Sequence, residues 1–441
     1  MFKKIIIIIT IILVLLLLVF GYAYITNTDT TTTKGETEVE EENFLFNIFS
    51  FGNRSNNTNP IESLVNFITG NTEEEQFQTQ LNRLNKISSM PVSGYGVLEK
   101  ERYVVVPEVN PETSTVGEKV TPTAPQTELV PILKYADKTN GNIYQTLVEN
   151  IEERRFSETV IPYIHESFFT KNHVIMRYLR NNSTIATFLG ELPKEILGAD
   201  SSNGNEIFGT FLPEDIKDIS ISPDNEKIFY LSNTKNGVIG VLTTDTDKQT
   251  KETIFDSQFT EWTSFWPNNE IITLTTKPSG LVNGYSYILN TKTKQYDKAL
   301  SGIRGLTTLM SPDTSTILYS DNNLSLSLFD INRTESRNLN IKTHPEKCVW
   351  AGDSVSIYCA VPKFVDASYT YPDSWYMGEV SYNDEIYKIN TQTGQKTKLV
   401  NPSEIYSDAN IDAINLKLDN KEENLFFMNK SDSYLWGLKL N

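Results

Sequence analysis

The chain has 441 residues, of which 39% are hydrophobic, and it carries a formal net charge of −17. Such an acidic balance excludes nucleic acid as a partner, because nucleic acids and anionic lipids bind a basic surface that releases counterions. Two cysteines are too few for a disulfide scaffold, and they do not form the CxxC pair that is typical of metal sites.

The N-terminus predicts a membrane anchor. Two lysines precede an apolar run over residues 5–25, and a helix of this length reaches about 30 Å, the thickness of the hydrocarbon core. No basic residue follows before Lys34, so the positive-inside rule places residues 1–4 in the cytoplasm and the rest of the chain outside. The alternative is a cleaved signal peptide, for which residues 21–23 form an acceptable site.

Residues 26–90 are expected to form a stalk. The first part is rich in Thr, Glu and Asn, as in flexible linkers, but an aromatic stretch at residues 44–51 interrupts it. This stretch is expected to lie on the membrane interface or against the folded domain. Short helices are predicted within residues 60–87, where Phe77, Leu81 and Leu84 fall on one helical stripe.

From residue 91 onward the pattern is strand-like and repetitive. A turn at Pro223 recurs at Pro267 and Pro312, so that successive prolines lie 44 and then 45 residues apart. A repeat of this length indicates one supersecondary unit used many times, because a single unit cannot bury its own apolar face. The turns divide the chain near residues 129–165, 166–214, 215–261, 262–304, 305–347, 348–411 and 412–441.

The last of these units holds only three predicted strands. A strand from the start of the domain would complete it and remove an exposed sheet edge, and the β-branched run at residues 103–106 is predicted to be that strand. We therefore predict an all-β fold, a β-propeller of about seven four-stranded blades over residues 91–441. Six or eight blades, or a stacked solenoid, are the alternatives.

The repeated turns resemble those of a known group of proteins. Ser222-Pro223-Asp224 and Ser311-Pro312-Asp313 are similar to the SPDG-type turn of TolB-like and WD-repeat-like propellers, with Asn225 and Thr314 where the family has Gly. The whole chain also resembles uncharacterised, signal-anchored bacterial envelope proteins that carry such a propeller. The resemblance implies a docking platform in the envelope, although relatives with these blades also sit beside hydrolase domains.

Motifs for catalysis are missing from the sequence. It contains no G-x-S-x-G elbow, Walker loop or HExxH motif, and only three histidines. We therefore predict no catalytic residues, no cofactor and no metal site. Paired carboxylates for glycoside cleavage leave no spacing signature, so a hydrolase or lyase acting on cell-wall polysaccharide or peptide is the alternative.

The two cysteines, Cys348 and Cys359, lie in the sixth unit. If residues 353–354 form a two-residue hairpin turn, counting outward sets the cysteines opposite each other on neighbouring strands. A disulfide at that distance is feasible with some strain, and two buried free thiols are the alternative.

An insertion at residues 363–382 of the sixth unit is the best candidate binding site. Tyr369, Tyr371, Trp375 and Tyr376 alternate there with hydroxyl and carboxylate groups, which suits stacking on a sugar or anchoring of a peptide. The alternative is that the rings plug the central channel or cover a neighbouring blade. We expect a non-catalytic, extracytoplasmic platform for an envelope protein or a cell-wall glycan, with a pure scaffold as a further alternative.

Overall fold

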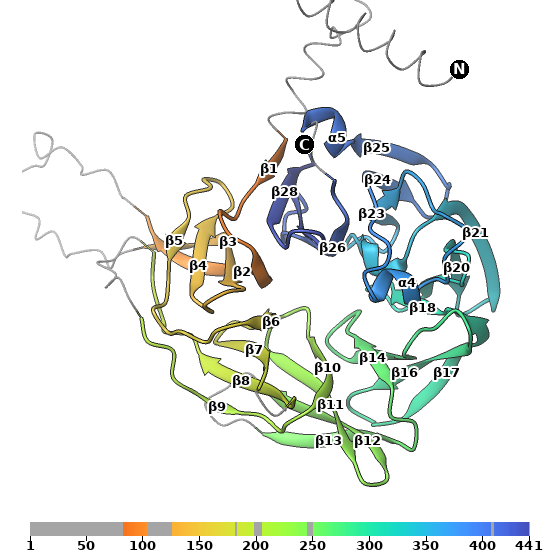
Figure 1. The fold of residues 1–441 in the computed structure, drawn as a ribbon, viewed down its shortest axis with the longest axis horizontal. Helices are drawn as coiled ribbons and strands as arrows, with labels where there is room; N and C mark the ends of the chain where they lie inside the picture. The colour runs from red at the N-terminus through yellow and green to blue at the C-terminus, as the bar shows by residue number, and fades with distance from the viewer. Residues whose placement is uncertain are drawn as a thin grey trace, which may run out of the picture. The chain divides into compact units, whose positions relative to one another are not determined.

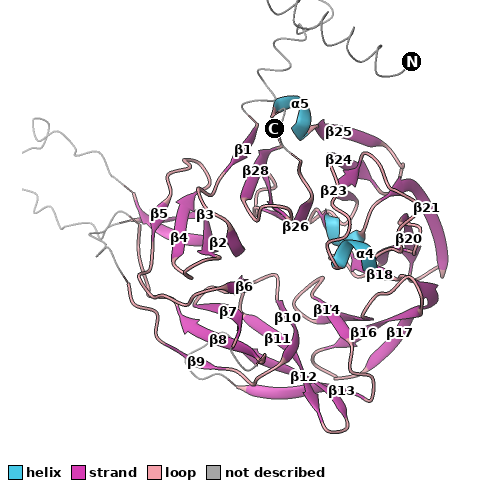
Figure 2. Ribbon diagram, viewed as in Figure 1, coloured by secondary structure: helices cyan, strands magenta, loops and turns pink. Residues whose placement is uncertain are grey.

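The computed structural model describes residues 83–104, 126–180, 183–197, 205–244, 250–406 and 410–440. These residues form seven four-stranded antiparallel sheets around a central axis (Figure 1). Strands make up nearly all of the regular structure, as Figure 2 shows. The prediction of a seven-bladed β-propeller is confirmed.

The predicted anchor at residues 5–25 and the aromatic stretch at residues 44–51 lie outside the described residues. In the described ranges, no helix combines the length and the apolar character that crossing a membrane needs.

The strands of each blade follow one another from the channel to the rim. Blade 1 holds β2 (Val92–Tyr103), β3 (Thr127–Asp137), β4 (Ile143–Leu147) and β5 (Arg154–Arg155). Blade 2 holds β6 (Ile164–Phe169), β7 (His173–Leu179), β8 (Ile185–Glu191) and β9 (Gly209–Phe211). Blade 3 holds β10 (Ile216–Ile221), β11 (Lys227–Thr234), β12 (Gly237–Thr244) and β13 (Lys251–Ser257). Blade 4 holds β14 (Trp262–Phe265), β15 (Ile271–Thr276), β16 (Asn283–Asn290) and β17 (Tyr296–Arg304).

The remaining blades follow the same plan. Blade 5 holds β18 (Thr307–Met310), β19 (Thr316–Ser320), β20 (Ser325–Asp330) and β21 (Glu335–Lys342). Blade 6 holds β22 (Cys348–Trp350), β23 (Ser356–Pro362), β24 (Asp384–Asn390) and β25 (Lys396–Val400). Blade 7 holds β26 (Ala413–Leu418), β27 (Asn424–Asn429), β28 (Leu435–Lys439) and β1 (Leu84–Lys86). Three short helices join them: η3 (Pro345–Lys347), α4 (Asp373–Tyr376) and α5 (Pro402–Ile405).

The core lies between the blades. Second strands such as β11 and β27 are apolar along most of their length, because both faces of each blade pack against neighbours. One cluster joins Phe229 and Leu231 of blade 3 to Trp262, Trp266 and other apolar side chains of blade 4. Burial of each such side chain contributes about 1.5–3 kcal/mol. The outer strand β21, in contrast, is largely exposed and polar.

The two Ser-Pro-Asp turns have the same local pattern of hydrogen bonds. Ser222 Oγ donates to Asp224 Oδ1 at 2.5 Å and accepts from Lys227 N at 2.9 Å, while Ser311 Oγ donates to Asp313 Oδ1 at 2.6 Å. The residue after each aspartate has a positive φ, 56° at Asn225 and 61° at Thr314. These are the two positions at which the resembling family has Gly, and Thr adopts this conformation with strain.

The ring closes through β1, which forms the outer strand of blade 7. β1 pairs with β28, with Leu84 opposite Leu438, and the Leu84 side chain is fully buried. The prediction that an N-terminal strand closes the ring is therefore confirmed, but the prediction that residues 103–106 form this strand is wrong. Tyr103 ends β2, the inner strand of blade 1, and Val104 lies beyond that strand.

The first blade also differs from the first repeat unit expected from the sequence. Blade 1 begins at Val92, because β2 lies ahead of the unit predicted to start near residue 129. Leu84, predicted to lie on a helical stripe, lies in a strand, since pairing with β28 overrides a weak local helical pattern.

Replacement of Leu84 by Ala is expected to lower the free energy of unfolding by about 2–4 kcal/mol, because it leaves a cavity at the seam of the ring. The matched control is Leu129→Ala, at a leucine that is 64% exposed, where a change within about 0.5 kcal/mol is expected. Chemical denaturation measures both. Equal effects of the two substitutions would contradict the seam at β1.

Replacement of Thr314 by Gly is expected to raise the free energy of unfolding by about 0.5–1 kcal/mol, because Gly adopts a positive φ without strain. Asn225→Gly is the matched control, and its gain should be smaller because Asn tolerates this conformation. Thermal unfolding compares the two variants. A loss of stability in Thr314→Gly would contradict the conclusion that Thr314 has a strained backbone.

Candidate functional site

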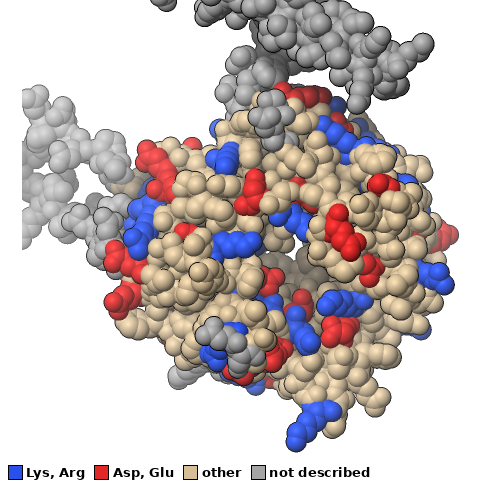
Figure 3. All heavy atoms as spheres, viewed as in Figure 1, with Lys and Arg blue, Asp and Glu red and all other residues tan. Residues whose placement is uncertain are grey.

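The first strands of the seven blades surround a central channel that holds a cavity of about 510 Å³. Figure 3 shows the hollow at the centre of one face, with acidic and basic side chains around it. Five blades contribute a hydroxyl group to the lining from their first strands: Ser93, Ser167, Ser220, Ser264 and Thr308. Blade 6 contributes Cys348 and blade 7 contributes Asn415 and Lys417.

The hydroxyl groups of the channel wall are bonded between blades. Ser93 Oγ donates to Ser167 Oγ at 3.0 Å, and the Oγ atoms of Ser220 and Ser264 lie 2.8 Å apart. Equivalent positions of neighbouring first strands therefore meet directly, and each pair satisfies buried polar groups. The wall of the channel is polar and held in place by these contacts.

Three carboxylates line the channel: Glu166, Asp218 and Glu346. Glu166 forms an ion pair with Arg177 at 2.5 Å. Asp218 accepts hydrogen bonds from Ser264 N at 2.7 Å and Ser264 Oγ at 2.5 Å. Among the described residues, neither Asp218 nor Glu346 lies within salt-bridge distance of a lysine or arginine.

The surroundings shift the pKa of these groups, although Asp218 is only half-buried and Glu346 and Lys417 are exposed to the channel. Burial raises the pKa of Asp218 to about 6, although hydrogen bonds from Ser264 oppose this rise. Burial also raises the pKa of Glu346, and the negative charge of Asp218 adds to the rise. On blade 7, burial lowers the pKa of Lys417 to about 8.

The insertion at residues 363–382 lies beside the channel. Tyr371 and Trp375 are buried and pack with Tyr382 and Leu324, so these two predicted binding residues form the core of the insertion. The Trp375 ring stacks on His344 with 4.5 Å between the ring centroids. The other two predicted residues are partly exposed, Tyr369 by 41% and Tyr376 by 39%.

Tyr376 connects the insertion to the channel. It is the last residue of α4, which Figure 2 shows beside the central opening, and its hydroxyl donates to Glu346 Oε1 at 2.5 Å. Of the four predicted binding residues, Tyr376 is therefore the one that touches a channel carboxylate.

A buried ion cluster fixes the insertion over η3. Lys347 Nζ lies 2.8 Å from Asp384 Oδ2 and 2.5 Å from Asp412 Oδ1, and all three side chains are fully buried. Asp412 also accepts from Trp375 Nε1 at 3.0 Å. Because removal of one partner would leave an unpaired buried charge, this cluster holds Glu346, the neighbour of Lys347, in place. No sequence spacing links Lys347 to residues 37 and 65 positions away.

A second loop packs against the insertion. Gly280, between β15 and β16, donates its N–H to Asp373 Oδ2 at 2.6 Å, and a Cβ at this position would lie 2.3 Å from Tyr371 O. The next residue, Leu281, is 75% exposed, and Met377 at the end of α4 is 67% exposed. We call the exposed side chains of the two loops the apolar rim: Leu281, Val282, Tyr369, Tyr376 and Met377.

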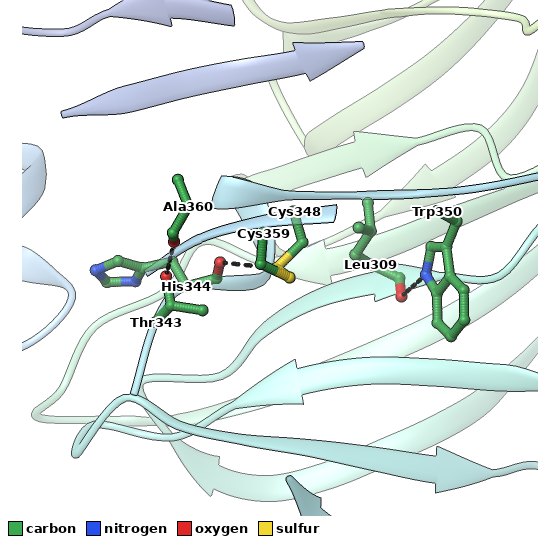
Figure 4. Close-up of a disulfide and its surroundings, with 7 residues drawn as sticks. All are labelled: Leu309, Thr343, His344, Cys348, Trp350, Cys359 and Ala360. Atoms are coloured by element: carbon green, nitrogen blue, oxygen red, sulfur yellow. Dashed lines mark hydrogen bonds between the residues drawn. A yellow bond between two sulfur atoms is a disulfide. The ribbon is translucent and has the colours of Figure 1, made fainter. Parts of the chain in front are cut away.

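The strands β22 and β23 carry a disulfide in the channel wall (Figure 4). Their register sets Cys348 opposite Cys359, as the count from the hairpin turn predicts, and the sulfurs are bonded at 2.11 Å. On one side of the disulfide Thr343 Oγ1 donates to Ala360 O at 2.7 Å. The described residues contain no group of three His, Cys, Asp or Glu side chains that could hold a metal ion.

Comparison with known proteins finds solved structures of low similarity and no related sequence. No protein-family model matches the chain, and no curated protein matches it in sequence. TolB from Acinetobacter baumannii is 12% identical, with a TM-score of 0.37, over 70% of this chain and 76% of TolB. Oligogalacturonate lyase from Vibrio parahaemolyticus is 11% identical, with a TM-score of 0.43, over 70% of this chain and 86% of the lyase.

A third solved structure, tricorn protease, is 10% identical with a TM-score of 0.33, and the match covers 67% of this chain but only 27% of the protease. The seven four-stranded sheets by themselves define this chain as a seven-bladed β-propeller.

Replacement of Asp218 by Asn is expected to raise the free energy of unfolding by about 1–2 kcal/mol at pH 8, because it removes a carboxylate whose ionised form burial disfavours. The folded pKa of about 6 lies above the unfolded value near 3.8, so Asp218 ionisation lowers stability as pH rises through this window. The gain in unfolding free energy should decrease as the pH falls from 6 to 4, and it should vanish below pH 4. Denaturation curves at pH 8 and pH 4 measure the difference, and a gain that is independent of pH would contradict this origin.

Proposed function

We propose that the protein is a non-catalytic β-propeller, displayed outside the cytoplasm on a membrane anchor, that holds a protein partner on the face with the apolar rim. One observation carries the proposal: exposed apolar side chains of two contacting loops lie next to the mouth of a polar channel. Exposed apolar groups of this kind mark interaction sites, and polar groups beside them supply specificity.

The location outside the cytoplasm is supported by the apolar run at residues 5–25 and the two lysines ahead of it. The disulfide between Cys348 and Cys359 agrees with this location, since disulfides persist in oxidising compartments. The stretch at residues 26–82 would separate the domain from the membrane surface.

A second candidate function is cleavage of cell-wall polysaccharide or peptide. Asp218 and Glu346 line one channel beside Tyr376, and a carboxyl group with a raised pKa can act as a general acid. The two carboxylates accept hydrogen bonds from Ser264 and Tyr376, so both are also suited to holding a ligand.

The test uses the full chain in its native membrane with a chemical cross-linker. Leu281→Asp with Met377→Asp places two charges in the apolar rim and is expected to reduce recovery of a specific protein partner at least tenfold. The matched control is Leu129→Asp with Leu179→Asp, at leucines of blades 1 and 2 that are 64% and 53% exposed. Equal recovery with both double variants, or equal loss, would contradict the proposal.

A further inference from the structure

We infer that Asn332 is a site of N-linked glycosylation, at which an oligosaccharide is attached to the hairpin between β20 and β21 of blade 5. The inference rests on the proposed function in one respect, because N-linked oligosaccharides are attached outside the cytoplasm. Asn332-Arg333-Thr334 matches the acceptor tripeptide, in which asparagine is followed by any residue except proline and then by serine or threonine.

The hairpin presents this tripeptide to solvent. Thr334 N donates to Asp330 O at 2.8 Å and Arg333 N donates to Asp330 Oδ1 at 2.9 Å, so the backbone of the turn is held in place. Asn332, Arg333 and Thr334 are all exposed. The Asn332 amide group and the Thr334 hydroxyl make no hydrogen bond with other described residues, so both are free to be recognised.

The described residues contain two other acceptor tripeptides, and the first of them begins at Asn429. This asparagine is buried. Its Nδ2 donates to Asn410 O at 3.2 Å, and its Oδ1 accepts from Asp412 N at 2.9 Å. The nitrogen atom that would have to be glycosylated is therefore already bonded inside the protein.

The second tripeptide, Asn323-Leu324-Ser325, is inaccessible for another reason. Asn323 is exposed, but Leu324 is fully buried in the core of the insertion and Ser325 begins β20. Ser325 N also donates to Asp321 Oδ1 at 3.0 Å. An enzyme could bind this tripeptide only by pulling Leu324 out of its apolar cluster, so burial selects Asn332 among the three asparagines.

The Asn332 hairpin lies on the face opposite the apolar rim. Each blade is an antiparallel meander, so the loop between its second and third strands and the loop between its third and fourth strands lie at opposite ends of the sheet. The insertion and the loop at Leu281 are of the first kind, and the Asn332 hairpin is of the second kind. An oligosaccharide at Asn332 would therefore leave the apolar rim open to a protein partner.

The donor is an oligosaccharide linked through a diphosphate to a polyisoprenoid lipid, and a membrane-bound oligosaccharyltransferase catalyses the transfer. Nδ2 of Asn332 forms a bond to C1 of the first sugar, while the bond between C1 and the phosphate oxygen breaks. The electron pair of that bond leaves with the polyisoprenyl diphosphate, and Nδ2 loses one proton to a base of the transferase. The Thr334 hydroxyl, which can donate and accept hydrogen bonds, identifies the tripeptide to the enzyme.

The test is mass spectrometry of proteolytic peptides from the full chain, purified from its native membrane. We expect an oligosaccharide on the peptide that contains Asn332, with at least tenfold higher occupancy than at Asn323 and no occupancy at Asn429. Asn332→Gln should remove this modification. An unmodified Asn332 in the unaltered protein would overturn the inference. Equal occupancy at Asn429 would also overturn it, because burial would then not select the site.

A matched pair of substitutions at Thr334 separates recognition of the tripeptide from a structural effect. Thr334 has a positive φ of 58°, which Gly adopts without strain, so Thr334→Gly removes the hydroxyl group and leaves the hairpin intact. This variant should reduce occupancy at Asn332 at least tenfold. Thr334→Ser keeps a hydroxyl group and should keep the occupancy within about twofold. Equal occupancy in the two variants would overturn the inference.

The failure of the inference is distinguishable from that of the proposed function. If Asn332 is unmodified and Leu281→Asp with Met377→Asp still reduces partner recovery, the inference falls and the proposed function stands. If Asn332 carries the oligosaccharide and partner recovery is equal with both double variants, the inference stands and the apolar rim is not the binding surface.

Discussion

The structure depends on the need of each blade to have both faces covered. Second strands such as β11 and β27 are apolar on the two faces, so a single sheet, or an open row of sheets, would expose apolar surface at its ends. A closed ring covers both faces of every blade only if its last blade is complete. Three residues, Leu84–Lys86, complete it, and the buried Leu84 side chain joins the cluster between blades 6 and 7.

Closing the ring also creates the candidate site. The first strands carry short polar side chains, and the hydroxyl pairs between blades fix the channel wall while leaving room for a cavity. Asp218 and Glu346 stand in this channel at some expense of stability, which is common for groups that a ligand later engages. The buried Lys347 cluster then links the channel to the rim, because it orders η3 and the insertion together.

Much of the architecture could be predicted from the sequence, because repeated turns and strands are local patterns. The turn at Pro223 and its two copies locate three of the blades, and the hairpin count finds the Cys348–Cys359 register. The closing strand was missed because three residues give no periodic signal, and the β-branched run that starts at the last residue of β2 is the stronger local pattern. The sequence locates the aromatic insertion, but it cannot distinguish the buried Trp375 from the exposed Tyr376. The burial of each ring depends on partners that are distant in sequence, such as His344.

The pairing of β1 with β28 has a consequence for the time course of biogenesis. The two strands are separated by about 350 residues, since Leu84 pairs with Leu438. At a synthesis rate of about 5–20 residues per second, the first strand emerges roughly 20–70 s before its partner exists. Blades 1 to 6 can form in the meantime, but the last seam can be joined only after β28 has been synthesised. Closure of the ring is therefore a late step, and until then the edges of blades 1 and 6 are open to chaperones and to other nascent chains.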